Sequence, residues 1–143
     1  MKIAIFIPEV SEVPTEDYDL ININDTHLIH DGSCEELFIG DCLDYIASGK
    51  EEFISTVCSK IKYGGRLILT GHDLQEICKA KSAHFIDEEK AQSLLYGGRT
   101  GLSGAYAIVD KISSKSLVNI SRRINNFKYT LIFQRPEPNE NTM

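Results

Sequence analysis

Residues 53–74 read FISTVCSKIKYGGRLILTGHDL, and this stretch decides the fold. Apolar side chains recur at positions 53, 54, 57, 58 and 61, a spacing that puts them on one face of a helix. Gly64 and Gly65 break this period, because glycine reaches backbone conformations that other residues adopt only with strain. The run after them, Arg66–Thr70, is mostly apolar and predicts a strand buried on both faces of a parallel sheet. We therefore interpret the stretch as a helix, a glycine turn and a buried strand.

The remaining segments alternate between strand and helix patterns. Further strands are predicted at 2–7, 18–24, 35–39, 105–112 and 128–134, with turn material at 27–33. Further helices are predicted at 43–47, 74–80, 87–95 and 116–123, the last capped by Ser116. This alternation indicates an α/β fold: a three-layer, Rossmann-like, mostly parallel sheet with helices on both faces. The last strand is expected beside its predecessor, in an orientation that periodicity leaves open.

Length and charge limit the classes of function. A chain of 143 residues with 42% hydrophobic content is large enough for one core and too small for two. We expect one domain over residues 1–135 and a flexible polar tail over 136–143. The net charge of −6 and pI near 5.2 argue against nucleic acid as the main partner. No apolar run approaches the roughly 18 residues of a membrane span, and the N-terminus does not resemble a signal peptide, so we expect a cytoplasmic protein.

The cysteine and histidine spacing does not predict a metal site. The four cysteines form no CxxC pair, so we interpret them as structural thiols, which lie at positions 34, 42, 58 and 78. His27 and His30 are three residues apart, but their segment does not have a helical pattern that would aim both rings at one ion. No metal is therefore expected.

Polar side chains follow two of the predicted strands, at the edge where open α/β sheets bind ligands. His72 and Asp73 follow the central strand and could form an acid/base pair, although Asp73 could equally cap the next helix and His72 could simply be exposed. Asp41 and Asp44 follow the 35–39 strand and could face a cleft, or Asp41 could cap the helical segment after it. Both interpretations stay open for each pair.

The segment GGRTGLSG, residues 97–104, contains four glycines. Such a loop could hold a phosphate or a carboxylate through its backbone amides, with Arg99 as the counter-charge. A glycine-rich loop after a helix is more often simply mobile, so the phosphate interpretation is the weaker one.

From Leu20 to Leu74 the chain resembles a small class I S-adenosylmethionine-dependent methyltransferase of the kind often found beside sugar-modifying enzymes. The matching segments are Asn22–Asn24, Asp31–Leu37, Asp41–Ile46, Lys62–Leu67 and Gly71–Leu74, with Leu95–Gly97 and Lys128–Pro136 further on. The chain departs from the family after its first strand, where Ile7–Glu12 stands in place of the glycine-rich cofactor loop.

This resemblance implies S-adenosylmethionine as the cofactor and assigns roles to residues. Cofactor-binding positions are implied at Asn24, which takes the place of the family's ribose-binding acid, and at Gly40, Asp41 and Cys42. Catalytic positions are expected at His72 and Asp73, and substrate contacts at Tyr96 and, from the glycine-rich loop, at Arg99.

Two classes of function follow from these observations. The first is a methyltransferase-like enzyme that acts on a small molecule or sugar and works mainly by aligning the acceptor with the cofactor methyl group. The second is a non-catalytic relative that keeps the sheet as a scaffold, as the partner of another protein or as a homo-oligomer that covers a sheet edge. A weaker third is binding of another adenosine- or sugar-nucleotide on the same fold.

Overall fold

The computed structural model describes residues 1–8, 17–46, 48–96 and 103–138. They form a six-stranded sheet in the order β2-β1-β3-β4-β6-β5. The strands are β1 (Lys2–Phe6), β2 (Asp19–Asn22), β3 (Cys34–Gly40), β4 (Ile61–His72), β5 (Val118–Asn125) and β6 (Lys128–Gln134). The first four strands are parallel, whereas β6 runs antiparallel to both β4 and β5. The expected α/β, mostly parallel, Rossmann-like sheet is confirmed, and β6 settles the orientation of the last strand.

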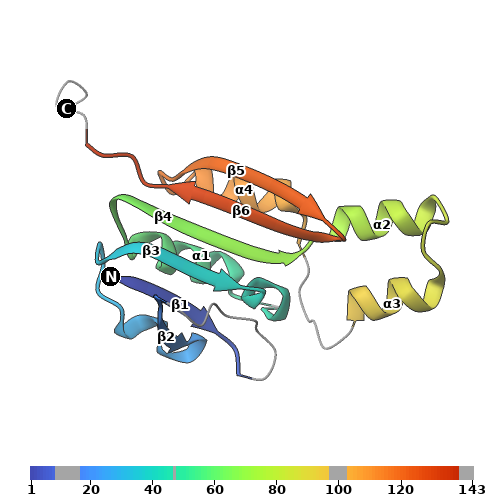
Figure 1. Ribbon diagram of the computed structural model, residues 1–143, viewed down its shortest axis with the longest axis horizontal. Helices are drawn as coiled ribbons and strands as arrows, with labels where there is room; N and C mark the ends of the chain where they lie inside the picture. Colours follow the sequence, from blue (N-terminus) through green and yellow to red (C-terminus); the bar gives the residue numbers. More distant parts are fainter. Residues whose placement is uncertain (9–16, 47, 97–102, 139–143) are drawn as a thin grey trace.

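Helices α1 (Lys50–Ser59) and α4 (Ala105–Ser113) lie together behind the sheet in Figure 1 and pack on one of its faces. Their inward side chains meet the inward side chains of the strands in one core, which includes Ile54, Ile108, Leu69 and Phe133. Helices α2 (Leu74–Ser82) and α3 (Glu88–Tyr96) project beyond the sheet and pack mainly against each other (Figure 1). Within the described residues, the second helical layer of the expected three is not seen.

The double glycine lies inside strand β4 rather than in a separate turn. Between the pairs Cys34↔Ile61 and Glu36↔Arg66, β3 advances by two residues while β4 advances by five. The extra residues form a bulge at which Gly64 has φ +77°. A Cβ on Gly65 would come within 2.7 Å of the Cys34 carbonyl oxygen, so only glycine fits the second position. The strand after the bulge is interior, as predicted.

Two predictions near the C-terminus are wrong: a predicted strand is a helix, and a predicted helix is mostly a strand. Residues 105–112, predicted as a strand, form helix α4, in which Ala105, Ile108 and Ile112 make one buried face. Residues 116–123, predicted as a helix, lie mostly in strand β5. Ser116 has φ +68°, a left-handed conformation that follows a helix end and is unsuited to a helix N-cap. Apolar runs this short fit the residue spacing of a helix as well as that of a strand, and tertiary packing decides which element forms.

The segment after β2 also differs from its prediction. The strand predicted at 18–24 ends at Asn22, whose side chain accepts a hydrogen bond from the Asn24 amide at 3.0 Å. This contact caps a 3₁₀ helix, η1 (Ile23–Leu28), which replaces part of the predicted turn. A second 3₁₀ helix, η2 (Cys42–Tyr45), follows β3 near the predicted helical segment.

Candidate functional site

Strands β3 and β4 end side by side and bring the polar residues after them together. Gly40 pairs with Thr70 in the sheet register, and the Asp41 amide donates to the Thr70 carbonyl at 3.0 Å. Because β1 and β2 are parallel to these strands, Asn24 lies along the same carboxyl edge. The expected juxtaposition of the Gly40 and Gly71 segments is confirmed.

The central contact of this edge joins Asp44 to His72. The Nδ1 atom of His72 lies 2.9 Å from Oδ2 of Asp44, and the His72 backbone amide donates to the same oxygen at 3.0 Å. The Asp44 side chain is 1% exposed and that of His72 is 15% exposed. A buried carboxylate therefore holds an imidazole that reaches the surface. The carboxylate that contacts His72 belongs to Asp44, whereas the acid/base pair considered from the sequence joined His72 to Asp73.

Asp73 has a structural position. Its carboxylate accepts a hydrogen bond from the Glu76 amide at 3.3 Å and caps helix α2. It also accepts from the Ala105 amide, at 2.9 Å, at the start of α4. Since Asp73 is 2% exposed, it joins two helices from inside the protein. The capping interpretation of this residue is confirmed.

Asp41 lies in a network with side chains of β4 and β6. Its carboxylate accepts from the Thr70 hydroxyl at 2.9 Å and lies 3.1 Å from the Lys128 amine. Asp41 occupies the N-cap position before η2 in a left-handed conformation, and its side chain makes no capping bond there. The capping interpretation of Asp41 is wrong, because its oxygens face Thr70 and Lys128 instead.

The hydroxyl of Tyr129 is buried beneath this edge. It has no hydrogen-bond partner among the described residues. Burial, followed by the charges of Asp44, Asp41 and Asp73, raises the pKa of this phenol well above its ordinary value. Tyr129 is therefore a buried, neutral phenol beneath the carboxyl edge.

Lys50 brings a positive charge to the same region. Its amine donates to the Ser103 hydroxyl at 2.7 Å. Burial lowers the pKa of Lys50, while the negative charge of Asp44 acts against that shift. The amine at the start of α1 thus connects the carboxyl edge with the segment before α4.

The remaining candidate residues are distributed as follows. Asn24 is exposed in η1, whereas Cys42 is fully buried and its thiol donates to the carbonyl groups of Ile5, at 3.6 Å, and Gly40, at 3.5 Å. Tyr96 ends helix α3. Arg99 and most of the glycine-rich loop lie outside the described residues. In the described part of the chain, no group of three or more metal-ligating side chains comes together, and no helix is long and apolar enough to cross a membrane.

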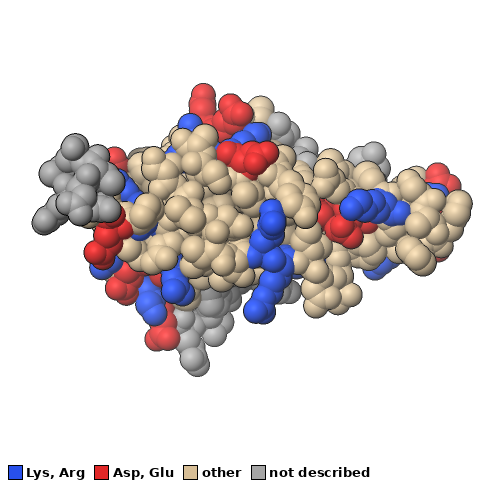
Figure 2. Space-filling view, turned by 90° about the horizontal axis from the view of Figure 1, so that it is seen from above, with Lys and Arg blue, Asp and Glu red and all other residues tan. Residues whose placement is uncertain are grey.

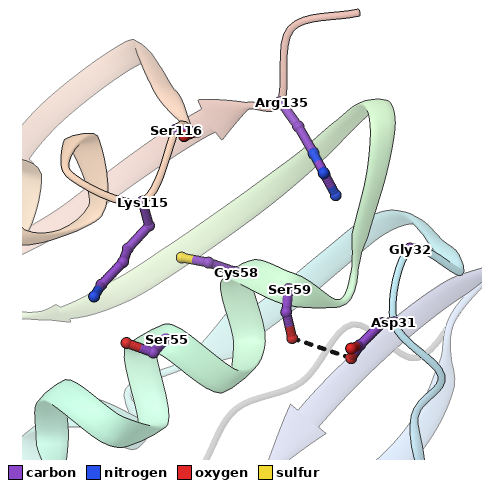
Figure 3. A pocket seen from close by; sticks show the side chains of 8 residues that line it. All are labelled: Asp31, Gly32, Ser55, Cys58, Ser59, Lys115, Ser116 and Arg135. Atoms are coloured by element: carbon purple, nitrogen blue, oxygen red, sulfur yellow. Dashed lines mark hydrogen bonds between the residues drawn. The ribbon is translucent and has the colours of Figure 1, made fainter. Parts of the chain in front are cut away.

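A cavity of about 540 Å³ lies at the other end of the sheet. It opens between the turn before β3, the end of α1 and the end of β6, so it belongs to the amino edge of the parallel strands. Figure 3 shows Lys115 and Arg135 extending toward it, and Ser59 donating to Asp31 on its far wall at 3.1 Å. None of the candidate catalytic residues lines this cavity.

This chain resembles known proteins in its structure. No protein-family model matches the sequence, and no curated protein matches it. An O-methyltransferase family protein from Burkholderia thailandensis aligns with 86% of this chain and 36% of its own, at 20% identity and a TM-score of 0.61. A SAM-dependent methyltransferase from Methanosarcina mazei aligns with 92% of this chain and 74% of its own, at 13% identity and a TM-score of 0.61. The chain has a class I methyltransferase-like fold.

A third methyltransferase-fold structure was solved with ligands. It is the 1,6-didemethyltoxoflavin-N1-methyltransferase of Burkholderia thailandensis with bound 1,6-didemethyltoxoflavin and S-adenosylhomocysteine, and it covers 84% of this chain and 52% of its own, at 5% identity and a TM-score of 0.56. This chain spans only 36%, 44% and 60% of the first three solved chains that it matches. At these identities the likeness concerns the methyltransferase-like fold alone.

His72 and Asp41 lie at the predicted edge of the sheet, and the residues that contact them were not predicted. Lys128 and Tyr129 come from β6, which lies beside β4 because of an antiparallel register that no local pattern encodes. The Asp44–His72 contact had one visible signal, since both residues follow buried strands that are neighbours in the sheet.

Proposed function

We propose that this protein transfers a methyl group from S-adenosylmethionine to a small molecule or sugar that carries an ionisable hydroxyl or amine. The observation that carries the proposal is the Asp44–His72 pair, which lies at the carboxyl edge of a methyltransferase-like sheet. This is the edge at which open α/β sheets bind their ligands.

His72 has the properties of a general base for such an acceptor. When Nδ1 donates its proton to Asp44, Nε2 is the basic nitrogen of the ring. The Asp44 carboxylate fixes the ring orientation and stabilises the imidazolium that forms when Nε2 accepts a proton. His72 would take the proton that the acceptor loses as its oxygen or nitrogen forms the new bond. Proton transfer of this kind contributes about 10²–10⁴-fold in rate.

The polar groups along the edge fit the cofactor at its ribose end. The side chain of Asn24 is exposed there and can bond ribose hydroxyls, with Asp25 exposed next to it. Asp41 and Cys42 would border the cofactor rather than hold it, because internal contacts already engage both side chains. When bound, S-adenosylmethionine supplies an electrophilic methyl group on a sulfonium ion, whose charge suits an edge with three carboxylates.

Calorimetric titration with S-adenosylhomocysteine tests binding, and turnover tests chemistry. Micromolar binding that His72→Gln retains and Asn24→Ala weakens would support the proposal. If His72→Gln also lowers methyl transfer at least 100-fold to an acceptor found by screening sugars and small hydroxyl compounds, His72 acts as the base. No heat change at millimolar ligand would reject methyl transfer.

A second function is favoured by the internal contacts of the carboxylates. Asp73 joins α2 to α4, and Asp41 binds Thr70 and Lys128, so two candidate site residues stabilise the fold. A non-catalytic scaffold that retains the methyltransferase-like sheet needs only these contacts. Absence of cofactor binding together with intact folding would support this function.

A further inference from the structure

The cavity at the amino edge of the sheet is separate from the edge that carries Asp44 and His72. Its walls come from the end of α1, the connection between α4 and β5, the turn before β3 and the residue after β6 (Figure 3). Strand β3 leads from this end of the sheet to the carboxyl edge, and its seven residues of about 3.3 Å each put about 20 Å between the two places. A small ligand in the cavity therefore does not reach the candidate catalytic pair.

Two cationic side chains extend toward the cavity from different elements. Lys115 follows α4, and Arg135 follows β6 (Figure 3). The Lys115 amine forms no ion pair with an acidic side chain in the described part of the chain. The Arg135 guanidinium donates to the Ile61 carbonyl at 2.8 Å and stacks on Tyr63, with its central carbon 4.2 Å from the ring centre. The bond to Ile61 engages one of the five guanidinium N–H groups, so both cations keep donors for a ligand.

Serine hydroxyls add neutral donors beside the two cations. Ser55 on α1 and Ser116 before β5 line the cavity, and neither hydroxyl bonds to another described residue. The Ser59 hydroxyl is engaged, since it lies 3.1 Å from Asp31 and 2.7 Å from the Thr56 carbonyl. Two cations and two hydroxyls suit a phosphoryl group, because its three oxygens accept more hydrogen bonds than the two oxygens of a carboxylate.

The negative groups that line the cavity already have partners within the chain. Asp31 pairs with the Lys60 amine at 2.9 Å. Helices α1 and α4 both end at this cavity, where unpaired carbonyl groups would repel an anion. The Ser59 carbonyl, however, accepts from the Gly32 amide at 2.9 Å, and the last carbonyls of α4 accept from amides just beyond the helix. The charges of the two cations are therefore not offset at the cavity.

We propose that this cavity binds the phosphoryl group of a small molecule. Lys115 and Arg135 balance the charge of the phosphoryl group, and the hydroxyls of Ser55 and Ser116 donate to its oxygens. The volume of about 540 Å³ lies within the range of about 300–1,000 Å³ that small-molecule sites occupy, so there is room for a sugar beside the phosphoryl group. The site does not depend on methyl transfer, because no residue of the carboxyl edge lines the cavity.

An NMR titration of the ¹⁵N-labelled chain in phosphate-free buffer tests both affinity and location. Ribose 5-phosphate should bind with a dissociation constant of about 0.1–1 mM, because several lining side chains are exposed and water competes for their donors. The amide signals of Gly32, Ser59 and Ser116 should shift, and those of Gly40 and His72 should not. Ribose should not bind, and succinate should bind at least about tenfold more weakly, since both lack a phosphoryl group.

Charge-removing variants test the two cations. Lys115→Gln should raise the dissociation constant of ribose 5-phosphate at least about tenfold, because a charge-assisted hydrogen bond is lost. Lys90→Gln makes the same change on the exposed surface of α3 and should have no effect. Arg135→Gln should weaken binding as much as Lys115→Gln. Circular dichroism checks that Arg135→Gln is folded, because the guanidinium also bonds the Ile61 carbonyl.

Inorganic phosphate identifies the source of the phosphoryl group. Tighter binding of ribose 5-phosphate supports a phosphorylated metabolite, and equal binding supports free phosphate. The proposal is overturned if ribose 5-phosphate causes no shifts, if the shifts are confined to Gly40 and His72, if succinate binds equally well, or if Lys115→Gln leaves the affinity unchanged. S-adenosylhomocysteine should shift Gly40 and leave Gly32 unchanged, so a failure of this proposal is distinguishable from a failure of methyl transfer.

Discussion

Gly71 lies directly against the hydroxyl of Tyr129 across the β4–β6 pair. A Cβ atom on Gly71 would overlap this hydroxyl and come within 2.8 Å of Oδ1 of Asp44. The absence of a side chain at position 71 is therefore what allows an aromatic ring and a carboxylate to pack at the end of the central strand.

Gly71→Ala should lower the free energy of unfolding by about 3 kcal/mol, because the new methyl group must displace a buried ring and a hydrogen-bonded carboxylate. Urea titration measures this change. Gly104→Ser is the control, since a Cβ there comes no closer than 3.4 Å to its neighbours, at Gln75, and the serine can cap α4. A Gly71→Ala variant as stable as the parent would mean that Tyr129 does not pack as described.

Tyr129→Phe should increase stability by about 1 kcal/mol near neutral pH, because the buried hydroxyl has no partner among the described residues. The raised pKa of Tyr129 adds a pH dependence. Above the ordinary value of 10.0 the unfolded chain loses this proton while the folded chain keeps it, so stability should fall as the pH rises past 10.

Thermal unfolding from pH 7 to 11 checks both effects. The decline above pH 10 should be smaller in Tyr129→Phe than in the parent. If the variant is instead less stable at pH 7, the hydroxyl makes a bond that stabilises the fold.

Asp73→Ala and Asp87→Ala remove the same type of helix cap in two different environments. Asp73 is buried and its carboxylate accepts from the amides of Glu76 and Ala105, whereas the carboxylate of exposed Asp87 accepts from the Lys90 amide at 2.7 Å. The loss should be about 3 kcal/mol for Asp73→Ala and about 1 kcal/mol for Asp87→Ala in chemical denaturation. Equal losses would contradict the role of Asp73 in joining two helices.

The thiol of Cys78 should react faster than that of Cys58, because it is more exposed to solvent. Cys78 is exposed, whereas burial raises the pKa of Cys58 to about 11. At pH 8 only about one in a thousand Cys58 side chains would be a thiolate, so an aromatic disulfide reagent should modify Cys78 first. Mass spectrometry of the labelled peptides identifies the site. Rapid labelling of Cys58 at pH 8 in the folded protein would contradict the burial of its helix face.

The central part of the fold could be predicted because its signals are local. The helical spacing before the double glycine and the apolar run after it each specify one element, and α1 and β4 follow them closely. The segments at 105–112 and 116–123 carry apolar residues whose spacing fits a helix as well as a strand. Their types were assigned wrongly because packing against β6, a long-range contact, decides them.

The location of the candidate site at the carboxyl edge of the sheet could be predicted, but the contacts between its side chains could not. His72 and Asp41 follow buried strands, and parallel strands end together, so their positions could be inferred. Which carboxylate meets His72 depends on how η2 folds back over the end of β4, and this is a matter of tertiary geometry. The contact between Asp41 and Lys128 depends in the same way on the antiparallel β6.

The edge of the sheet formed by β5 has its own charge pattern. This strand carries Arg122 and Arg123 and lies at the top of Figure 1. In the view from above, basic side chains form a band across a mostly uncharged surface (Figure 2). Arg122 stacks on Tyr106 of α4, with its guanidinium carbon 4.7 Å from the ring centre. A charged edge strand resists pairing with another sheet, so edge-to-edge aggregation is disfavoured.

Because α2 and α3 pack mainly against each other, the hairpin that they form is almost a module of its own. Insertions or substitutions in this hairpin would change the surface next to the carboxyl edge of the sheet. They would leave the burial of the strands unchanged. Among related proteins, the sequence of the α2–α3 hairpin is therefore expected to vary more than the sequence of the strands.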